Sequence, residues 1–283
     1  MHLILSNIGT QLPDHIVDCL EQTRKFYNGK ITLVTNSNNC ENLKKYDVNI
    51  YNPNIENVKF KFLENVTFSN SPNREFWVYS LSRLFFIEDF VAKNKIENFV
   101  TYDNDILIYS NLEEIVTKIS KLYNNIAITI GDDNRAVFGF SYFKTYTNLI
   151  RLNDDIIEIL KHPENFDYLM RDFLNEMLII RKISKDKDYI EPLPIFPTDK
   201  NYNELGFIFD PASYGQFLGG APKLHGNEDS FIDEGTYIGK ELLKGNYKVF
   251  FNKIDGPFTI DKENNRHKIF NLHMWSKNLK KFM

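Results

Sequence analysis

The order of apolar and polar residues at the start of the chain limits the fold more than any other feature. Residues 3–9 (LILSNIG) predict a buried strand, residues 14–27 (DHIVDCLEQTRKFY) an amphipathic helix, and residues 31–37 (ITLVTNS) a second strand. Continuous apolar runs of this kind are typical of parallel strands, which a right-handed crossover helix connects. We expect the strands to end near Asn7 and Asn36 on one edge of a sheet, where α/β folds bind ligands.

The rest of the chain extends this pattern without a visible domain boundary. Residues 74–95 form a long helical pattern, with Leu81 and Phe85 at helical spacing, and lead into an apolar stretch at residues 99–102. The sequence has no internal repeat, linker or low-complexity segment. With 283 residues, of which 42% are hydrophobic, the chain can bury a full core. We therefore expect one α/β domain over residues 1–283.

Charge and composition argue against several classes of function. The formal net charge of −4 does not favour nucleic acid as a partner, because phosphate backbones require a basic face. No stretch approaches the roughly 20 apolar residues of a membrane span, and no basic segment precedes the first apolar run. Cys19 and Cys40 have no metal-type spacing. We expect a soluble, unprocessed, cytoplasmic protein, with at most a peripheral membrane contact through its basic tail.

Two aspartates follow the apolar stretch at residues 99–102. Asp103 and Asp105 flank one asparagine in the segment FVTYDNDILIY. If the chain stays extended, residues two apart point the same way, so both carboxylates face one side. Like charges at this spacing repel unless a cation lies between them, and oxygen ligands suit Mg²⁺ or Mn²⁺. The alternative is a solvated turn, because Asp and Asn are common turn residues.

This arrangement resembles the nucleotide-sugar-dependent glycosyltransferases of the GT-A fold. In that family an Asp-x-Asp follows a strand of a Rossmann-like mixed sheet, which helices flank. Residues 208–220 (IFDPASYGQFLGG) and 269–279 (IFNLHMWSKNL) are also similar to small glycosyltransferases encoded by large viruses and by bacterial polysaccharide loci. The tail pattern of those proteins is approximately Asn-Leu-His-x-His-Ser-Lys, and Trp275 here replaces the second histidine.

The resemblance implies a metal site formed by Asp103, Asp105 and His273. It also implies Mn²⁺ or Mg²⁺ as the cofactor, held against the diphosphate of the donor. A neutral imidazole is a suitable ligand for such an ion, and these three groups leave positions for phosphate oxygens and water. We expect residues 1 to about 130 to form the nucleotide-binding half. Residues from about 131 to 283 would form the acceptor side, with the tail folded back to bring His273 to the aspartates.

Several residues are expected to surround the donor. They are Asn7, Arg83, Asp103, Gln216, Gly219, Gly220 and Lys277. Lys277, one helical turn beyond His273, would neutralise the leaving diphosphate. The family often places a basic residue of the long helix near the phosphates, which implies this role for Arg83. Each of these positions also has an ordinary interpretation as a solvated charge, a loop amide or a turn glycine.

The catalytic base is expected among the acidic residues of the second half. In related enzymes an acidic residue on a helix after the sheet often binds the acceptor or acts as the base, which favours Glu176 and Asp172. Asp229 and Glu234 are further candidates. A base would deprotonate the acceptor hydroxyl in an inverting reaction, whereas a retaining reaction proceeds on the front face of the sugar.

The expected function is transfer of a sugar, from a UDP-sugar by the family's commonest choice, to a hydroxyl of a glycan or glycoconjugate in polysaccharide biosynthesis. One alternative is a non-catalytic module that binds nucleotide sugar or glycan. Another is a phosphohydrolase of the haloacid-dehalogenase type, with Asp103 as nucleophile and the Gly-Asp-Asp at residues 131–133 as its distal acids. A polymerase site built on that triplet is a third, but the chain lacks a basic template channel.

Overall fold

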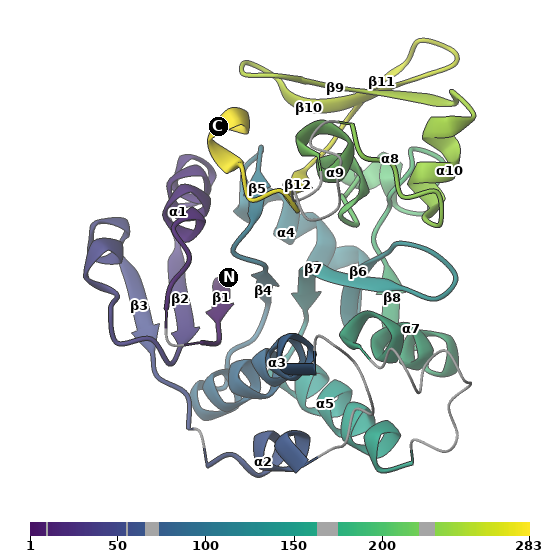
Figure 1. Ribbon diagram of the computed structural model, residues 1–283. Helices are drawn as coiled ribbons and strands as arrows, with labels where there is room; N and C mark the ends of the chain where they lie inside the picture. Colours follow the sequence, from purple (N-terminus) through teal and green to yellow (C-terminus); the bar gives the residue numbers. More distant parts are fainter. Residues whose placement is uncertain (10, 55, 66–73, 163–174, 221–229) are drawn as a thin grey trace.

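A mixed sheet of seven strands forms the centre of the protein in this computed structural model (Figure 1). The structure describes residues 1–283 except 10, 55, 66–73, 163–174 and 221–229. In spatial order, the strands are β3 (Val48–Tyr51), β2 (Lys30–Thr35), β1 (His2–Asn7), β4 (Phe99–Tyr102), β7 (Ala136–Phe143), β6 (Ile126–Ile130) and β8 (Ile190–Pro192). Strand β7 runs antiparallel to β4 and β6, and all other neighbours are parallel.

Alternate residues of each central strand enter two different hydrophobic cores, one on each face of the sheet. In β1, Leu3 and Leu5 belong to one core and Ile4 belongs to the other. This alternation follows from the two-residue period of an extended strand. Helices α1 (His15–Phe26) and α4 (Leu112–Leu122) pack on the first face. The second face carries α2 (Val58–Asn65), α3 (Arg74–Asn94), α5 (Tyr146–Lys161) and α7 (Glu176–Asp186).

The first strand, helix and strand form the parallel unit that the sequence predicts. Strands β1 and β2 pair in parallel with Asn7 opposite Thr35, so the two strands end at one edge of the sheet. Helix α1 buries Ile16 and Leu20 completely, in agreement with its apolar periodicity. The prediction of an α/β fold with a mixed sheet is confirmed.

Smaller elements lie beside the sheet. Strands β9 (Tyr247–Asn252), β10 (Gly256–Asp261) and β11 (Arg266–Lys268) form a separate antiparallel sheet, which lies at the top of Figure 1. The short helical segments are η1 (Glu41–Tyr46), α8 (Tyr202–Leu205), α9 (Ser213–Gly219), α10 (Tyr237–Leu243) and η4 (Leu279–Phe282). Among the described helices, none has the length and the apolar character that crossing a membrane requires.

The end of the chain forms a separate two-stranded sheet with the segment that follows β4. Strand β12 (Asn271–His273) pairs antiparallel with β5 (Ile106–Ile108), which follows β4 after a three-residue connection of Asp103, Asn104 and Asp105. In this register His273 lies opposite Ile106. The pairing therefore fixes the C-terminal histidine beside the two aspartates.

Candidate metal centre

The Asp-Asn-Asp segment is a tight turn between β4 and β5, not a continuation of an extended strand. The backbone N–H of Ile106 donates to the carbonyl of Asp103 at 3.1 Å, which closes the turn. Only the last residue of the turn is removed from solvent: Asp105 is 2% exposed, whereas the Asp103 side chain is 21% exposed. The extended geometry assumed from the sequence is therefore wrong. The alternative of a turn is right about the backbone, but Asp105 in this turn is buried and not solvated. His273 faces both carboxylates from the opposite strand.

Three side chains meet at this turn. The Nε2 atom of His273 lies 3.3 Å from Oδ1 of Asp105 and 3.7 Å from Oδ2 of Asp103. Each residue offers one ligand atom, and the three atoms lie within 4.8 Å of one another. Two carboxylate oxygens and one imidazole nitrogen suit Mn²⁺ or Mg²⁺, with coordination positions left open. The donor set thus fits a divalent cation.

The charges of the cluster shift the pKa values of its members in opposite directions. Burial alone would raise the pKa of Asp105, but His273 and Lys277 outweigh it and lower that pKa. Burial alone would lower the pKa of His273, but the negative charge of Asp105 outweighs it and raises that pKa. Asp105 is thereby held in its anionic form, which is the form a metal requires.

Arg83 joins the cluster from α3. Its guanidinium forms an ion pair with Asp103 and a second one with Oε1 of Glu176 at 2.5 Å. Glu176 is 2% exposed, and its other oxygen accepts a hydrogen bond from Ser80 at 2.5 Å. Burial raises the pKa of Glu176 despite the nearby guanidinium. Arg83 is therefore held between two carboxylates, one of which belongs to the candidate metal site.

Glu176 begins α7 behind this arginine, and Asn175 caps the helix by accepting a hydrogen bond from the N–H of Leu178. Both oxygens of Glu176 are already bonded, so its surroundings favour a role in fixing Arg83. The role of catalytic base stays a prediction for Glu176. The other candidates on this side, Asp172 and Asp229, lie outside the described residues.

Lys277 reaches the cluster from the tail and forms an ion pair with Asp105. The sequence interpretation placed it one helical turn beyond His273, which is wrong. After β12 the chain forms a turn in which the N–H of Lys277 donates to the carbonyl of Met274, and Lys277 has a positive φ of 61°. The lysine side chain is 45% exposed. It therefore meets the metal site from the solvent side.

The first strand–helix connection lies next to the same turn. The amide of Asn104 donates to Oδ1 of Asn7 at 3.2 Å, and its carbonyl lies 2.9 Å from Nε2 of His15 at the start of α1. A polar pocket of about 390 Å³ lies beside them, and its lining is Asp14, His15, Asp18, Lys277, Asn278, Leu279 and Lys280. This pocket shares Lys277 with the metal site, and sequence reasoning found neither His15 nor the pocket.

The candidate residues of α9 face the tail. A Cβ atom at Gly219 would collide with the end of the Met274 side chain, which would have to move. Gly220 ends the helix with a φ of 76°, a conformation that suits glycine. Gln216 is half-buried in the same helix. The structure thus explains Gly220 by helix termination, and contact of the three residues with a donor stays a prediction.

The Gly-Asp-Asp triplet does not form an acidic pair. Asp132 forms an ion pair with Arg135 at 2.5 Å, and Asp133 accepts a hydrogen bond from Tyr237 at 2.6 Å. Glu234, the remaining candidate base, is exposed. Within the described part of the chain, the one group with metal-ligand spacing is that of Asp103, Asp105 and His273. The phosphohydrolase and polymerase alternatives therefore lack the acidic site that each of them requires at this triplet.

Comparisons with known proteins support the fold. No protein-family model and no curated protein sequence matches the chain. Its structure is similar to mouse xyloside xylosyltransferase 1 in the apo form, with a TM-score of 0.51, 11% sequence identity, and coverage of 72% of this chain and 91% of that one. The chain has the fold of a GT-A glycosyltransferase.

Two other solved structures with this GT-A fold are less similar. The galactosyltransferase LgtC, in complex with donor and acceptor sugar analogues, has a TM-score of 0.45, 12% identity, and coverage of 69% of this chain and 73% of that one. The glycosyltransferase GlyE of Streptococcus pneumoniae has a TM-score of 0.42, 12% identity, and coverage of 76% and 47%. At these identities the likeness concerns the fold, and function has to be argued from the site itself.

Proposed function

We propose that the protein is a metal-dependent glycosyltransferase, which transfers a sugar from a nucleoside diphosphate sugar to a hydroxyl of a glycan or glycoconjugate. The observation that carries the proposal is the convergence of Asp103, Asp105 and His273 within 4.8 Å, in a chain with a GT-A fold. Two basic residues, Arg83 and Lys277, flank this cluster. Such a combination suits a ligand that brings both a metal and a diphosphate.

The three clustered residues would hold Mn²⁺ or Mg²⁺. When bound, this ion would act as a Lewis acid for the departing diphosphate. The protein itself keeps Asp105 anionic through the neighbouring positive charges and fixes Asp103 through Arg83. Since each of the three residues provides one ligand atom, coordination positions stay open for phosphate oxygens and water.

We place the nucleotide in the polar pocket between α1 and the tail. Lys277 lines this pocket and also reaches the metal site, so it joins the two. His15 lines this pocket, and Asn104 connects it to Asn7; imidazole and amide groups of this kind suit a ribose or a base. Uridine is the preferred base from the family resemblance. Residues 1 to about 130 would thus serve the donor, and the later residues would serve the acceptor.

Two cations would stabilise the diphosphate as it leaves. Arg83 is oriented by Glu176 before any ligand arrives, and a preorganised charge of this kind costs little reorganisation during the reaction. Lys277 is exposed enough that its side chain would be able to leave Asp105 and bind a phosphate oxygen instead. An acidic residue of the second half would act as the base that deprotonates the acceptor hydroxyl, and Glu176 and Asp172 are the candidates.

A thermal-shift panel tests the proposal directly. UDP, GDP, CDP and ADP are each added with Mn²⁺, with Mg²⁺ and with EDTA. We expect one nucleotide to stabilise the protein only when a metal is present, by about 2.7 kcal/mol at 100 times its dissociation constant. Asp105→Ala should abolish this effect, whereas Asp133→Ala, the matched control at the Gly-Asp-Asp triplet, should keep it. The absence of any metal-dependent stabilisation in the wild type would contradict the proposal.

Turnover separates the enzyme from a module that only binds nucleotide sugar. The nucleotide identified by the panel is supplied as its common hexose conjugates with Mn²⁺, and release of the nucleoside diphosphate is measured. We expect slow hydrolysis that exceeds the background and disappears in Asp105→Ala. Metal-dependent binding without any turnover, with or without added oligosaccharides, would favour the non-catalytic module.

A further inference from the structure

The imidazole of His273 lacks the restraint that usually orients a metal-binding histidine. Such a ring normally donates its second N–H to a carboxylate or a carbonyl, which fixes its orientation. Here Nε2 faces the aspartates, but Nδ1 is buried and has no hydrogen-bond partner among the described residues. The orientation of the ring must therefore be fixed in another way.

Asp210 binds the backbone of His273 through a hydrogen bond. This carboxylate is completely buried, and its Oδ2 accepts hydrogen bonds from the N–H of His273 at 2.9 Å and of Gly215 at 2.8 Å. Its Oδ1 accepts from the N–H of Tyr214 at 2.8 Å. One carboxylate thus joins the first turn of α9 to β12. At Gly215 a Cβ atom would collide with the carbonyl of His273, so α9 packs directly on this strand.

Gly139 of β7 limits the ring from the other side. A Cβ atom at this position would lie 2.7 Å from Nδ1 of His273, so any side chain larger than hydrogen would displace the imidazole. The carbonyl of Gly139 also accepts the N–H of Asp103 at 3.0 Å. Gly139 therefore bonds to Asp103 through its backbone, and its lack of a side chain leaves the space that the ring of His273 occupies.

We propose that Asp210 and Gly139 are positioning residues for the metal centre, which orient His273 through its backbone and through steric confinement in place of a bond to Nδ1. Neither residue provides one of the three ligand atoms. Their role rests on the proposed function, because it concerns the affinity of the same site for Mn²⁺. Sequence reasoning missed both residues, since Asp210 precedes a proline and resembles a turn, and Gly139 resembles an ordinary strand glycine.

The test compares Asp210→Asn and Gly139→Ala with Asp199→Asn. Asp199 is a matched control, because its Oδ2 accepts the N–H groups of Ile195 and Phe196 at 2.8 Å each and it does not contact the metal centre. Binding of Mn²⁺ alone is measured by electron paramagnetic resonance of the free ion. We expect about 10- to 100-fold weaker binding in the two site variants, the range found for outer-shell partners, and unchanged binding in Asp199→Asn.

A second readout separates positioning from mere loss of stability. Circular dichroism melting identifies the temperature at which each variant is fully folded, and Mn²⁺ binding and the histidine ring NMR signals are recorded there. Wild-type affinity in folded Asp210→Asn and Gly139→Ala would overturn the inference, and so would an equal loss of affinity in Asp199→Asn. A wild-type protein without metal-dependent nucleotide binding would instead contradict the proposed function.

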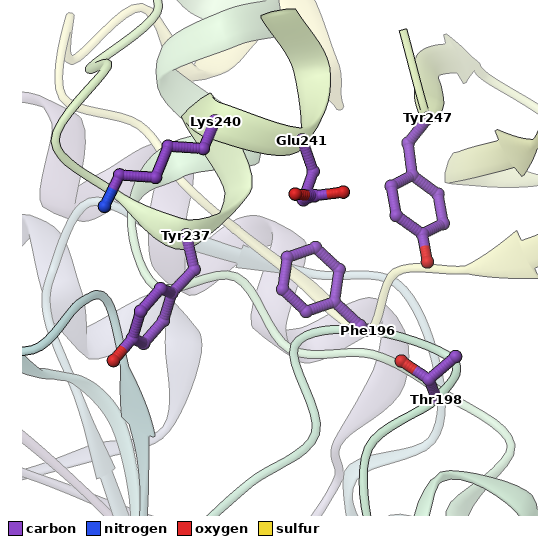
Figure 2. Close-up of a pocket in the computed structure, with 6 residues that line it drawn as sticks. All are labelled: Phe196, Thr198, Tyr237, Lys240, Glu241 and Tyr247. Carbon is purple, nitrogen blue, oxygen red and sulfur yellow. The ribbon is translucent and has the colours of Figure 1, made fainter. Parts of the chain in front are cut away.

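A different observation carries a second inference, which does not depend on the metal centre. A pocket of about 250 Å³ lies between α10, β9 and the segment before α8, and its lining is Phe196, Thr198, Tyr237, Lys240, Glu241 and Tyr247 (Figure 2). Phe196 stacks on Tyr247 with ring centroids 5.5 Å apart and planes inclined by 22°. The Glu241 carboxylate is fixed by bonds from Lys244 at 2.7 Å and from Asn246.

We infer that this pocket binds one pyranose ring of a carbohydrate. A pyranose has apolar C–H faces, which stack on aromatic rings, and a rim of hydroxyl groups, which bond to carboxylates and hydroxyls. Both kinds of group are present, from the rings of Phe196 and Tyr247 and from Glu241 and Thr198. The pocket is smaller than the roughly 300–1,000 Å³ typical of drug-sized ligands, which agrees with a single sugar unit.

Saturation-transfer NMR with free glucose, galactose and mannose, without metal or nucleotide, tests this inference. The control is Phe250→Ala, because Phe250 stacks on Phe258 in nearly the same geometry, at 5.4 Å and 21°, in the same small sheet but outside the pocket. We expect saturation of at least one hexose by the wild type and by Phe250→Ala, and its loss in Tyr247→Ala and Glu241→Gln. No signal in the wild type, or signals that survive both pocket substitutions, would overturn the inference.

Discussion

The two aspartates of the metal centre are separated by one residue, yet the cations that balance their charges differ in how far they are buried. Asp103 faces Arg83, a helix residue whose side chain is 17% exposed and which is bound a second time by the buried Glu176. Asp105 is itself buried, but its partner Lys277 belongs to a turn of the tail and is 45% exposed. One side of the site is therefore part of the core, and the other side borders solvent.

This difference shows which side of the site can change during a reaction. A buried ion pair that loses one member leaves an uncompensated charge in the core, so Arg83 cannot leave Glu176 without a large cost. An exposed lysine regains water when it leaves its partner, and the net free energy of such a surface pair is small. The Asp103 side thus acts as fixed scaffold, and the Asp105 side can exchange a lysine for a metal and its ligand.

The largest expected effect follows from removing the fixed cation. Arg83→Met leaves Glu176 buried without its partner, so we expect the free energy of unfolding to fall by about 3–5 kcal/mol. Urea denaturation of the EDTA-treated protein measures this change. The double variant Arg83→Met/Glu176→Gln should recover part of the loss, because it removes the unpaired charge. A loss below about 1 kcal/mol in the single variant would show that this side is no more fixed than a surface pair.

Lys277→Met should have the opposite profile. We expect a change of at most about 1 kcal/mol in the free energy of unfolding, because the lysine is half-exposed and His273 still lies against the buried Asp105 when the lysine is removed. Metal-dependent nucleotide binding should weaken about 10- to 100-fold, or by about 1.4–2.8 kcal/mol, which is close to the contribution of a hydrogen bond to a charged group. Isothermal titration with the nucleotide identified by the panel measures it.

The tail offers a matched control for this lysine. Lys280 is 80% exposed and lies 4.0 Å from Asp18, at the edge of the polar pocket. Lys280→Met should leave both stability and nucleotide affinity nearly unchanged. If Lys280→Met weakened binding as much as Lys277→Met, the tail would act through its general positive charge, and the specific exchange at Asp105 would be contradicted.

The regular half of the fold was predictable because its signals are local. The apolar runs of β1 and β2 and the periodicity of α1 indicate a parallel unit, and the register of the two strands agrees with it. Asp103 and Asp105 stand out because they are charged residues between two apolar stretches. Their turn geometry was not predictable, since the same residue types suit a strand end and a turn equally well.

The approach of His273 to the aspartates has no local signal at all. It depends on the pairing of β12 with β5, two three-residue strands that lie far apart in the sequence. Only the family resemblance indicated it. Strands as short as these carry too few residues for a periodic pattern. The strand β12 was therefore not recognised, and Lys277 was wrongly placed on a helix. Asp210 and Gly139 escaped notice because the bonds that connect them to His273 and Asp103 join positions far apart in sequence.

The smallest expected effect is a pH dependence that distinguishes the metal-free site from the metal-bound one. The pKa of His273 is raised above its ordinary value of 6.5 by Asp105, which outweighs burial. A raised pKa in the folded state means that this contribution to stability is complete below 6.5 and is lost as the pH rises through the folded value. We therefore expect the EDTA-treated wild type to lose stability relative to His273→Gln across that window, by chemical denaturation between pH ~5 and ~8.

Metal affinity should change in the opposite direction over the same window, because Mn²⁺ competes with the proton on His273 and binds the neutral imidazole. Affinity would rise with pH while the stability of the metal-free protein falls. Lys277→Met should preserve both trends, since Asp105 rather than the lysine raises the histidine pKa and the lysine lowers it. If the stability difference between wild type and His273→Gln were constant with pH, Asp105 and His273 would not be coupled, and the tail would contribute to this site only through Lys277.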